Sequence, residues 1–201
     1  MAINTGKVQI LNKIFMIYWE WDTLPELENP EDNSPEYLLL QLYDDLKAEA
    51  LSQYNFRSSI KYVNLECEEP DTNDDERYKY RAAVPEDFLK ATGFWEDATR
   101  SCPIHNSVDI HNFIAKTNCP TFTMAYVSKT IEEDKLDQWV IDYLSIYIAS
   151  KASDIGGCSA EKKQYLMQEA ILQRNLCANR DMEMAHQDDM ASLNQFLEDF
   201  A

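Results

Sequence analysis

Glycine is scarce in this chain, with only four glycines among 201 residues. Glycine-rich phosphate loops and the glycine fingerprints of dinucleotide-binding sites both need several glycines close together, because only glycine lets the backbone approach a phosphate so closely. Neither motif is present. The composition therefore argues against a nucleotide-dependent enzyme, and it also argues against flexible glycine-rich linkers.

Basic residues are also few. The chain has 18 Lys and Arg against 36 Asp and Glu, so its formal net charge is −18. Proteins that hold nucleic acid use Lys and Arg to neutralise phosphates, and a surface this acidic repels DNA instead. The charge alone leaves two interpretations open: an ordinary acidic protein, or a surface that stays near DNA without adhering to it.

The number of cysteines and the absence of long apolar runs indicate in which compartment the protein is made. The five cysteines are odd in number and widely spaced, which favours reduced thiols in a protein assembled inside the cell over a secreted disulfide framework. The first 22 residues have no basic start and no small-residue cleavage site, so we expect no signal peptide. No apolar run approaches the roughly 20 residues of a membrane span, so we expect no membrane contact.

Catalytic motifs are missing as well. There is no G-x-S-x-G motif and no Cys–His pair with a plausible third partner. The strongest metal candidates are Cys102, His105, His111 and Cys119, in the pattern C-x2-H-x5-H-x7-C, because thiolates and imidazoles suit tetrahedral zinc. The spacing of the second pair is unlike that of a zinc finger, and His111 falls within an expected strand. We therefore predict no metal site, no cofactor and no enzymatic activity.

Apolar periodicity predicts two helices in the first quarter of the chain. The first covers about residues 5–20, with Val8 among the residues of its apolar face. The second begins after a cap at Ser34, because Pro35 suits the first helical position, and it ends near Tyr54.

Two longer helices are predicted near the end of the chain. The third begins at a capping box formed by Thr130 and Glu133 and ends at the glycine pair 156–157. The fourth covers about 159–185 and is followed by a short separate segment. The residues of the fourth helix expected to face inward are Tyr165, Leu166, Leu172, Leu176 and Cys177.

Between the two pairs of helices the pattern favours strands. We predict strands at 56–66, 78–84, 109–117 and 121–129. The second ends at a proline in "KYRAAVPEDFLK", where Glu86 and Asp87 are expected to start a turn or a helix. The first two strands are separated by a stretch expected to be an exposed loop, whose carboxylates are Glu66, Glu68, Glu69, Asp71, Asp74, Asp75 and Glu76.

This order of elements predicts an α+β fold: a helical bundle of two N-terminal and two long C-terminal helices, with an inserted, mostly antiparallel β subdomain. The expected parts are N-terminal helices at 1–55, the β subdomain at 56–129, the long helices at 130–187 and a tail at 188–201. The tail carries an apolar set at helical spacing, which docks either on the protein's own core or on a partner: Leu193, Phe196, Leu197 and Phe200.

Four stretches of the chain carry a likeness to a known family: "ALSQYNFRSSIKYVNLE", "YKYRAAVPEDFLKATG", "IEEDKLDQWVIDYLSIYIASKASDIGG" and "CSAEKKQYLMQEAILQRNLCANRDMEMAHQDD". In their order and pattern they resemble the head-to-tail adaptors of short-tailed double-stranded DNA phages, of the tail tubular protein A type. The likeness covers roughly residues 35–188 and is one of order and pattern. The first 34 residues match less well, and residues 91–108 are an insertion without a counterpart.

The resemblance implies a structural virion protein of the phage tail, without catalysis. Such adaptors form a ring, typically a dodecamer, beneath the portal protein, extend the DNA channel used in DNA ejection, and provide attachment for the tail nozzle and tail fibre proteins. Double-stranded DNA passes through without specific binding. The family's C-terminal portal contact falls here on Leu193, Phe196, Leu197 and Phe200. The acidic stretch that begins at Glu66 is expected to face the channel or the next ring.

A different class of protein explains the charge equally directly. An acidic intracellular binding module, such as a DNA mimic or a regulatory partner protein, also needs a large excess of carboxylates. A DNA mimic has its carboxylates spaced like phosphates on one face and acts as a monomer or dimer. Its state of assembly therefore distinguishes it from a ring-forming adaptor.

Overall fold

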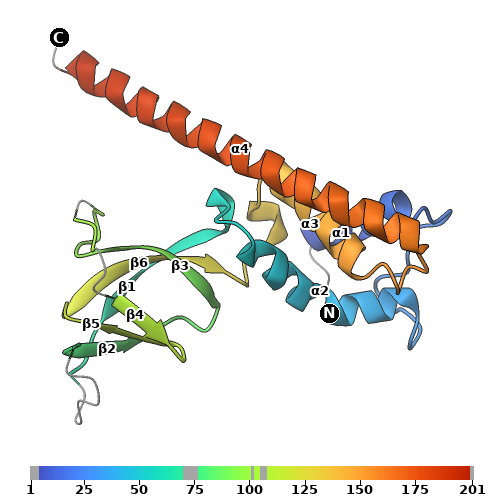
Figure 1. Cartoon of the computed structure of the whole chain (residues 1–201), viewed down its shortest axis with the longest axis horizontal. Helices are drawn as coiled ribbons and strands as arrows, with labels where there is room; N and C mark the ends of the chain where they lie inside the picture. The colour runs from blue at the N-terminus through green and yellow to red at the C-terminus, as the bar shows by residue number, and fades with distance from the viewer. Residues whose placement is uncertain (1–4, 70–76, 101, 105–107, 200–201) are drawn as a thin grey trace. The chain divides into compact units, whose positions relative to one another are not determined.

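The computed structural model describes residues 5–69, 77–100, 102–104 and 108–199, with side chains up to residue 185. Over these residues the chain forms four α-helices and two three-stranded antiparallel sheets (Figure 1). The α+β fold class predicted from the sequence is confirmed. The chain divides into two compact units: a helical unit made of Met1–Ser58 and Glu132–Ala201, and a β unit made of Ser59–Ile131.

The helical unit begins with α1, Thr5–Lys13, which continues into a π-helical turn at Ile14–Tyr18. The predicted helix over 5–20 is confirmed to within two residues. The helix ends at Trp19, whose indole Nε1 donates to the carbonyl oxygen of Ala149 at 3.2 Å. Gly156 lies so close to this indole that a Cβ there would collide with the ring. Trp19 is therefore a core residue.

The second helix, α2, is Pro35–Ser52. The predicted cap is confirmed, because the Ser34 Oγ accepts from the backbone N–H of Tyr37 at 3.2 Å. Leu39 and Tyr43 are fully buried one turn apart on the inner face of α2.

The third helix, α3, is Gln138–Lys151, and both of its predicted ends are wrong. The Thr130–Glu133 pair does not cap a helix; Glu133 instead starts a short 3-10 turn, Glu133–Lys135, and its carboxylate binds side chains of α2. The helix also ends before the glycine pair, which follows a series of turns. Gly157 has a φ of 66°, a left-handed conformation that suits glycine. Apolar residues are buried nearly all round α3, which makes it the central helix of the unit.

The fourth helix, α4, is Ala160–Asp199. Its predicted start is confirmed, since the Ser159 Oγ accepts from the backbone N–H of Lys162 at 3.2 Å. The predicted end near residue 185 is wrong, because the helix runs on as one piece of 40 residues, about 60 Å long (Figure 1). No proline or glycine occurs after residue 157, so nothing in the sequence stops the helix.

The β unit contains six strands in two antiparallel sheets. The strands are β1 Ile60–Glu66, β2 Tyr80–Ala83, β3 Phe88–Trp95, β4 Val108–His111, β5 Ile114–Thr117 and β6 Thr121–Ser128. The first sheet has the order β1-β6-β3 and the second the order β2-β5-β4. Phe122, Met124 and Tyr126 of β6 share one core cluster with Ala115 of β5, so the two sheets pack face to face.

One strand prediction is wrong. The segment 109–117 is a hairpin of β4 and β5, because Asn112 and Phe113 both have positive φ, 50° and 60°, and reverse the chain in two residues. After Pro85, Glu86 and Asp87 form a turn, which is one of the two expected outcomes. The chain then enters the strand β3, which pairs with β6 through two register shifts. Pro85 thus separates two strands of different sheets.

Candidate functional site: polar clusters and outer faces

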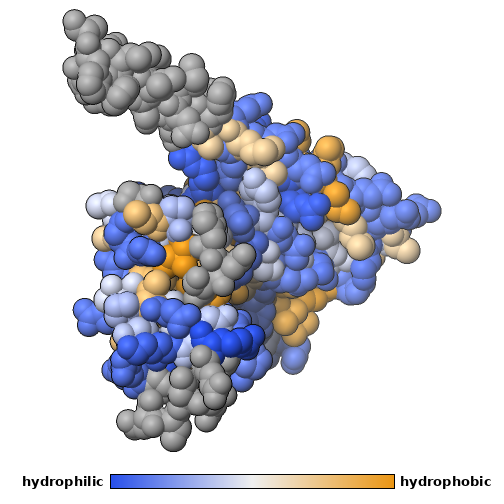
Figure 2. Space-filling model, turned by 60° about the vertical axis from the view of Figure 1, so that its left-hand side comes forward, coloured by the Kyte–Doolittle hydropathy of each residue, from blue (hydrophilic) through white to orange (hydrophobic). Residues whose placement is uncertain are grey.

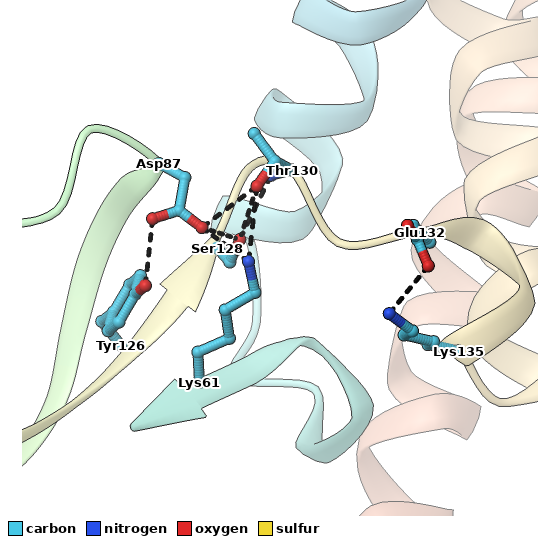
Figure 3. A network of polar contacts seen from close by, with 7 residues as sticks. All are labelled: Lys61, Asp87, Tyr126, Ser128, Thr130, Glu132 and Lys135. Atoms are coloured by element: carbon cyan, nitrogen blue, oxygen red, sulfur yellow. Dashed lines mark hydrogen bonds and ion pairs between the residues drawn. The ribbon is translucent and has the colours of Figure 1, made fainter. Parts of the chain in front are cut away.

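Asp87 occupies the end of the "VPED" motif and binds four side chains of the β unit (Figure 3). One carboxylate oxygen accepts from the Tyr126 hydroxyl at 3.0 Å. The other accepts from Lys61 Nζ at 2.7 Å, from Ser128 Oγ at 2.6 Å and from Thr130 Oγ1 at 3.1 Å. The cluster therefore joins the start of β3 to the end of β6 and to β1.

The charge of Asp87 is held by these donors. Burial by itself raises the pKa of this carboxyl, but the hydrogen bonds from Lys61 and the three hydroxyls outweigh it and hold the pKa well below its ordinary range. Such a carboxylate is a poor proton acceptor. The contacts of Asp87 hold the turn after Pro85 against β1 and β6, so we interpret this residue as structural and not catalytic.

A second buried cluster holds the helical unit together. The carboxylate of Glu133 accepts from Lys47 Nζ at 2.8 Å and from the Tyr43 hydroxyl at 3.1 Å. Lys47 and Glu133 are only 5% and 3% exposed. Burial, together with the nearby Glu133, raises the pKa of Tyr43 far above its ordinary value, so the phenol stays a donor. By contrast, the Glu132–Lys135 pair, 2.7 Å apart, is exposed (Figure 3).

Asp181 and Cys177 attach α4 to the rest of its unit. The Asp181 carboxylate accepts from the backbone N–H of Arg57 at 3.1 Å and from the Trp139 indole at 3.4 Å. The Cys177 thiol donates to the carbonyl oxygen of Trp139 at 3.0 Å. Burial raises the pKa of Cys177 to about 12, so this thiol stays protonated and unreactive at neutral pH.

The candidate zinc ligands lie on different elements. Cys102 follows β3, His111 ends β4, and Cys119 lies in the turn between β5 and β6, while His105 falls outside the described residues. Within the described ranges, no three His, Cys, Asp or Glu side chains are grouped as metal ligands. The thiol that interacts with Cys119 is Cys67, whose pKa is raised by burial and then by this neighbour.

The acidic stretch begins at the exposed end of β1. Glu66 is the last residue of that strand, and Glu68 exchanges two backbone hydrogen bonds with Arg81 of β2. Glu69 forms an exposed ion pair with Lys79 at 3.1 Å. The remaining carboxylates of the stretch, Asp71, Asp74, Asp75 and Glu76, lie outside the described residues.

The outer surface of α4 is unexpectedly apolar. Its inner face is formed by Leu166, Ala170, Cys177 and Asp181. Tyr165, Leu172 and Leu176, which the sequence places inside, are 57%, 51% and 43% exposed. On the other side of the inner face, Met167, Ile171 and Met182 are 50%, 54% and 58% exposed and follow the helical period. Figure 2 shows, on the face it presents, hydrophobic residues in separate groups between hydrophilic ones.

The candidate portal residues lie farther along the same helix. Leu193, Phe196 and Leu197 belong to α4, whose backbone is described to Asp199, and Phe200 falls outside the described residues. Leu193, Phe196 and Leu197 therefore belong to the same helix as the exposed apolar residues Tyr165 and Met167.

The outer face of α1 is also apolar. A shallow hollow there is lined by Thr5, Val8, Gln9, Asn12, Lys13, Met16 and Ile17. Ile17 is 58% exposed, and Val8, which the sequence places on the inner face, is only half-buried. Residues 1–19 contain no Asp or Glu, although the whole chain has 36. We name this surface the α1 face, and it is an acid-free surface on an acidic protein.

No protein-family model matches this chain, and a search of curated proteins finds no relative. None of the helices in the described part of the chain combines the length and the apolar composition that crossing a bilayer requires. The exposed faces of the helices and the net charge of −18 are the features of the chain that bear on its function.

Proposed function

We propose that this chain is a structural virion protein, a ring-forming head-to-tail adaptor that joins the portal of a short-tailed phage to its tail. The observation that carries the proposal is α4, which exposes large apolar side chains on both sides of its packed face. Large apolar side chains that stay exposed along two sides of one helix are candidates for contact with another chain.

A ring accounts for two separate apolar surfaces on one subunit. In a head-to-tail ring each copy contacts two neighbours through two different surfaces, whereas a two-fold dimer uses one surface twice. The α1 face and the side of α4 that carries Met167, Ile171 and Met182 are such a pair of surfaces on the helical unit. In this proposal the four helices form the bundle that makes the ring, and the β unit is available to the nozzle and fibre proteins.

The charge fits a channel through which DNA slides. Each copy carries −18, and carboxylates around a channel repel phosphates within a screening length of about 8–10 Å at ordinary ionic strength. The acidic stretch from Glu66 is the candidate for the channel or for the next ring. The distal end of α4, with Leu193, Phe196, Leu197 and Phe200, is the candidate portal contact.

The test is the mass of the protein in solution, alone and with the portal protein of the same virus. We expect a monomer alone at micromolar concentration and a large ring on the portal, both measured by light scattering. A chain that stays monomeric with the portal, and instead binds a basic DNA-binding protein in the same assay, is a DNA mimic. That result would replace the adaptor by the acidic binding module.

A further inference from the structure

We propose that neighbouring copies of this chain meet through the α1 face of one copy and the outer stripe of α4 in the next. The outer stripe is defined by Gln164, Met167, Ile171, Asn175, Ala178 and Met182, which follow one another at spacings of three or four residues. This contact rests on the proposed ring and names the surfaces that form it.

The occupant is a second copy because no residue of either surface is an acid, and Asp142 beside the α1 face is paired with Lys13. Two chains of −18 repel each other, so they approach most easily where neither presents an acid. The α1 face has Lys13 as its charged side chain, and the outer stripe has none. Lys13 is 2.5 Å from Asp142 of its own chain, which leaves the face close to neutral.

The opposite side of α4 is less suited to contact the α1 face, because it carries charged side chains. Next to Tyr165, Leu172 and Leu176 the helix carries Glu169 and Glu183, and Lys162 lies 6.0 Å from the centre of the Tyr165 ring. The outer stripe has only Gln and Asn between its apolar residues, as the α1 face has Thr, Gln and Asn. Two such surfaces exclude water without leaving a charge unpaired.

The outer stripe is long enough to accommodate the α1 face. The α1 face runs from Thr5 to Ile17, about 18 Å of helix, and the stripe from Gln164 to Met182 covers about 27 Å. A single helix-on-helix contact of this size buries less than the roughly 800 Å² per partner of a standard stable interface. Pairs are therefore expected to be weak, and closing a ring makes them stable.

The contact is tested by substituting one residue on each surface. Ile17→Glu and Ile171→Glu place a carboxylate on the α1 face and on the outer stripe, and both side chains are already more than half exposed. The matched control is Leu24→Glu, since Leu24 is 70% exposed and lies on neither surface. Circular dichroism verifies that all three variants keep the wild-type fold.

Association is measured by sedimentation equilibrium at protein concentrations up to about 1 mM, in about 0.5 M salt to screen the repulsion. We expect the mass of the wild type and of Leu24→Glu to rise with concentration. Ile17→Glu and Ile171→Glu should each associate at least tenfold more weakly. Because each variant keeps one intact surface, their equimolar mixture should form dimers and nothing larger.

Other outcomes overturn the contact. Pairing of α4 with α4 predicts that Ile17→Glu associates like the wild type and that the mixture forms no dimers with Ile171→Glu. A wild type that stays monomeric throughout shows that these surfaces do not pair. If Ile17→Glu still forms rings on the portal as readily as the wild type, the contact is wrong and the adaptor proposal stands. If the mixture dimerises but the wild type forms no ring on the portal, the contact stands and the adaptor proposal is wrong.

Discussion

Lys47 Nζ lies 2.8 Å from Oε1 of Glu133, and the two residues come from segments 86 positions apart in the chain. The pair joins α2 to the 3-10 turn that precedes α3, so it connects the two halves of the helical unit that the β unit separates in sequence. Removing one partner of a buried ion pair leaves the other charge without compensation.

Glu133→Gln should lower the free energy of unfolding of the helical unit by about 3 kcal/mol, because the Lys47 ammonium then lacks its counter-charge. Urea unfolding followed by helical circular dichroism measures the loss. The matched control is Glu132→Gln, whose pair with Lys135 is exposed to solvent and is expected to contribute little. Equal effects of the two substitutions would show that Glu133 is not buried as described.

Asp87→Asn should destabilise the β unit by about 3 kcal/mol at neutral pH, because the substitution removes charge-assisted hydrogen bonds from Lys61 and three hydroxyls. Hydrogen exchange of peptides from 121–128 reports the loss on β6. The control is Glu86→Gln, which changes the exposed neighbour in the same motif.

The effect of Asp87→Asn should also depend on pH. The folded pKa of Asp87 is depressed, so its stabilisation is present above the unfolded pKa of about 3.9 and is lost as pH falls toward the folded value. The difference between wild type and variant should therefore be constant near neutral pH and shrink below about pH 4. A difference that grows on acidification would contradict a depressed pKa.

Gly6→Ala should destabilise the helical unit although alanine is the better helix former. A Cβ at position 6 would lie 2.6 Å from the Cβ of Glu133, so α1 must move away from the 3-10 turn. We expect a loss of about 2 kcal/mol, because overpacking exceeds the gain in helix propensity of about 1 kcal/mol. Thermal melting decides the sign, and a stabilised variant would show that α1 and Glu133 are not in close contact.

Deletion of residues 189–201 should impair assembly on the portal while leaving the melting temperature of the helical unit nearly unchanged. The last buried α4 residue among the described side chains is Asp181, so the deletion spares the described packing of α4. The helical signal should fall only by the share of the deleted residues. A matched point variant, Phe196→Asp, should reproduce the assembly defect without shortening the helix. A large drop in melting temperature would place these residues in the protein's own core.

A local sequence signal predicted where α2 begins. Ser34 with Pro35 caps this helix as expected, because a hydroxyl that accepts from a nearby amide acts within one turn of chain. Ser159 caps α4 in the same way. The capping pattern at Thr130 failed because both of its side chains have stronger partners elsewhere: Thr130 binds Asp87, and Glu133 binds Lys47. Such partners are distant in sequence, so a local pattern does not reveal them.

The strand β3 also depends on a partner that is distant in the sequence. Its residues carry no clear alternation, and it exists because β6 supplies its hydrogen-bond partners through two register shifts. The hairpin of β4 and β5 likewise depends on two residues with positive φ, Asn112 and Phe113, of which only asparagine is a usual turn residue.

The sequence by itself determined the charge of −18, the α+β class and the apolar residues of α4. Only the tertiary structure decided which of those residues meet α3. The helix carries apolar side chains on several sides with polar ones between them, so periodicity alone does not distinguish Leu166, which is buried, from Leu172, which is half exposed. That choice is made by packing between elements, and it leaves Met167, Ile171 and Met182 of the outer stripe exposed.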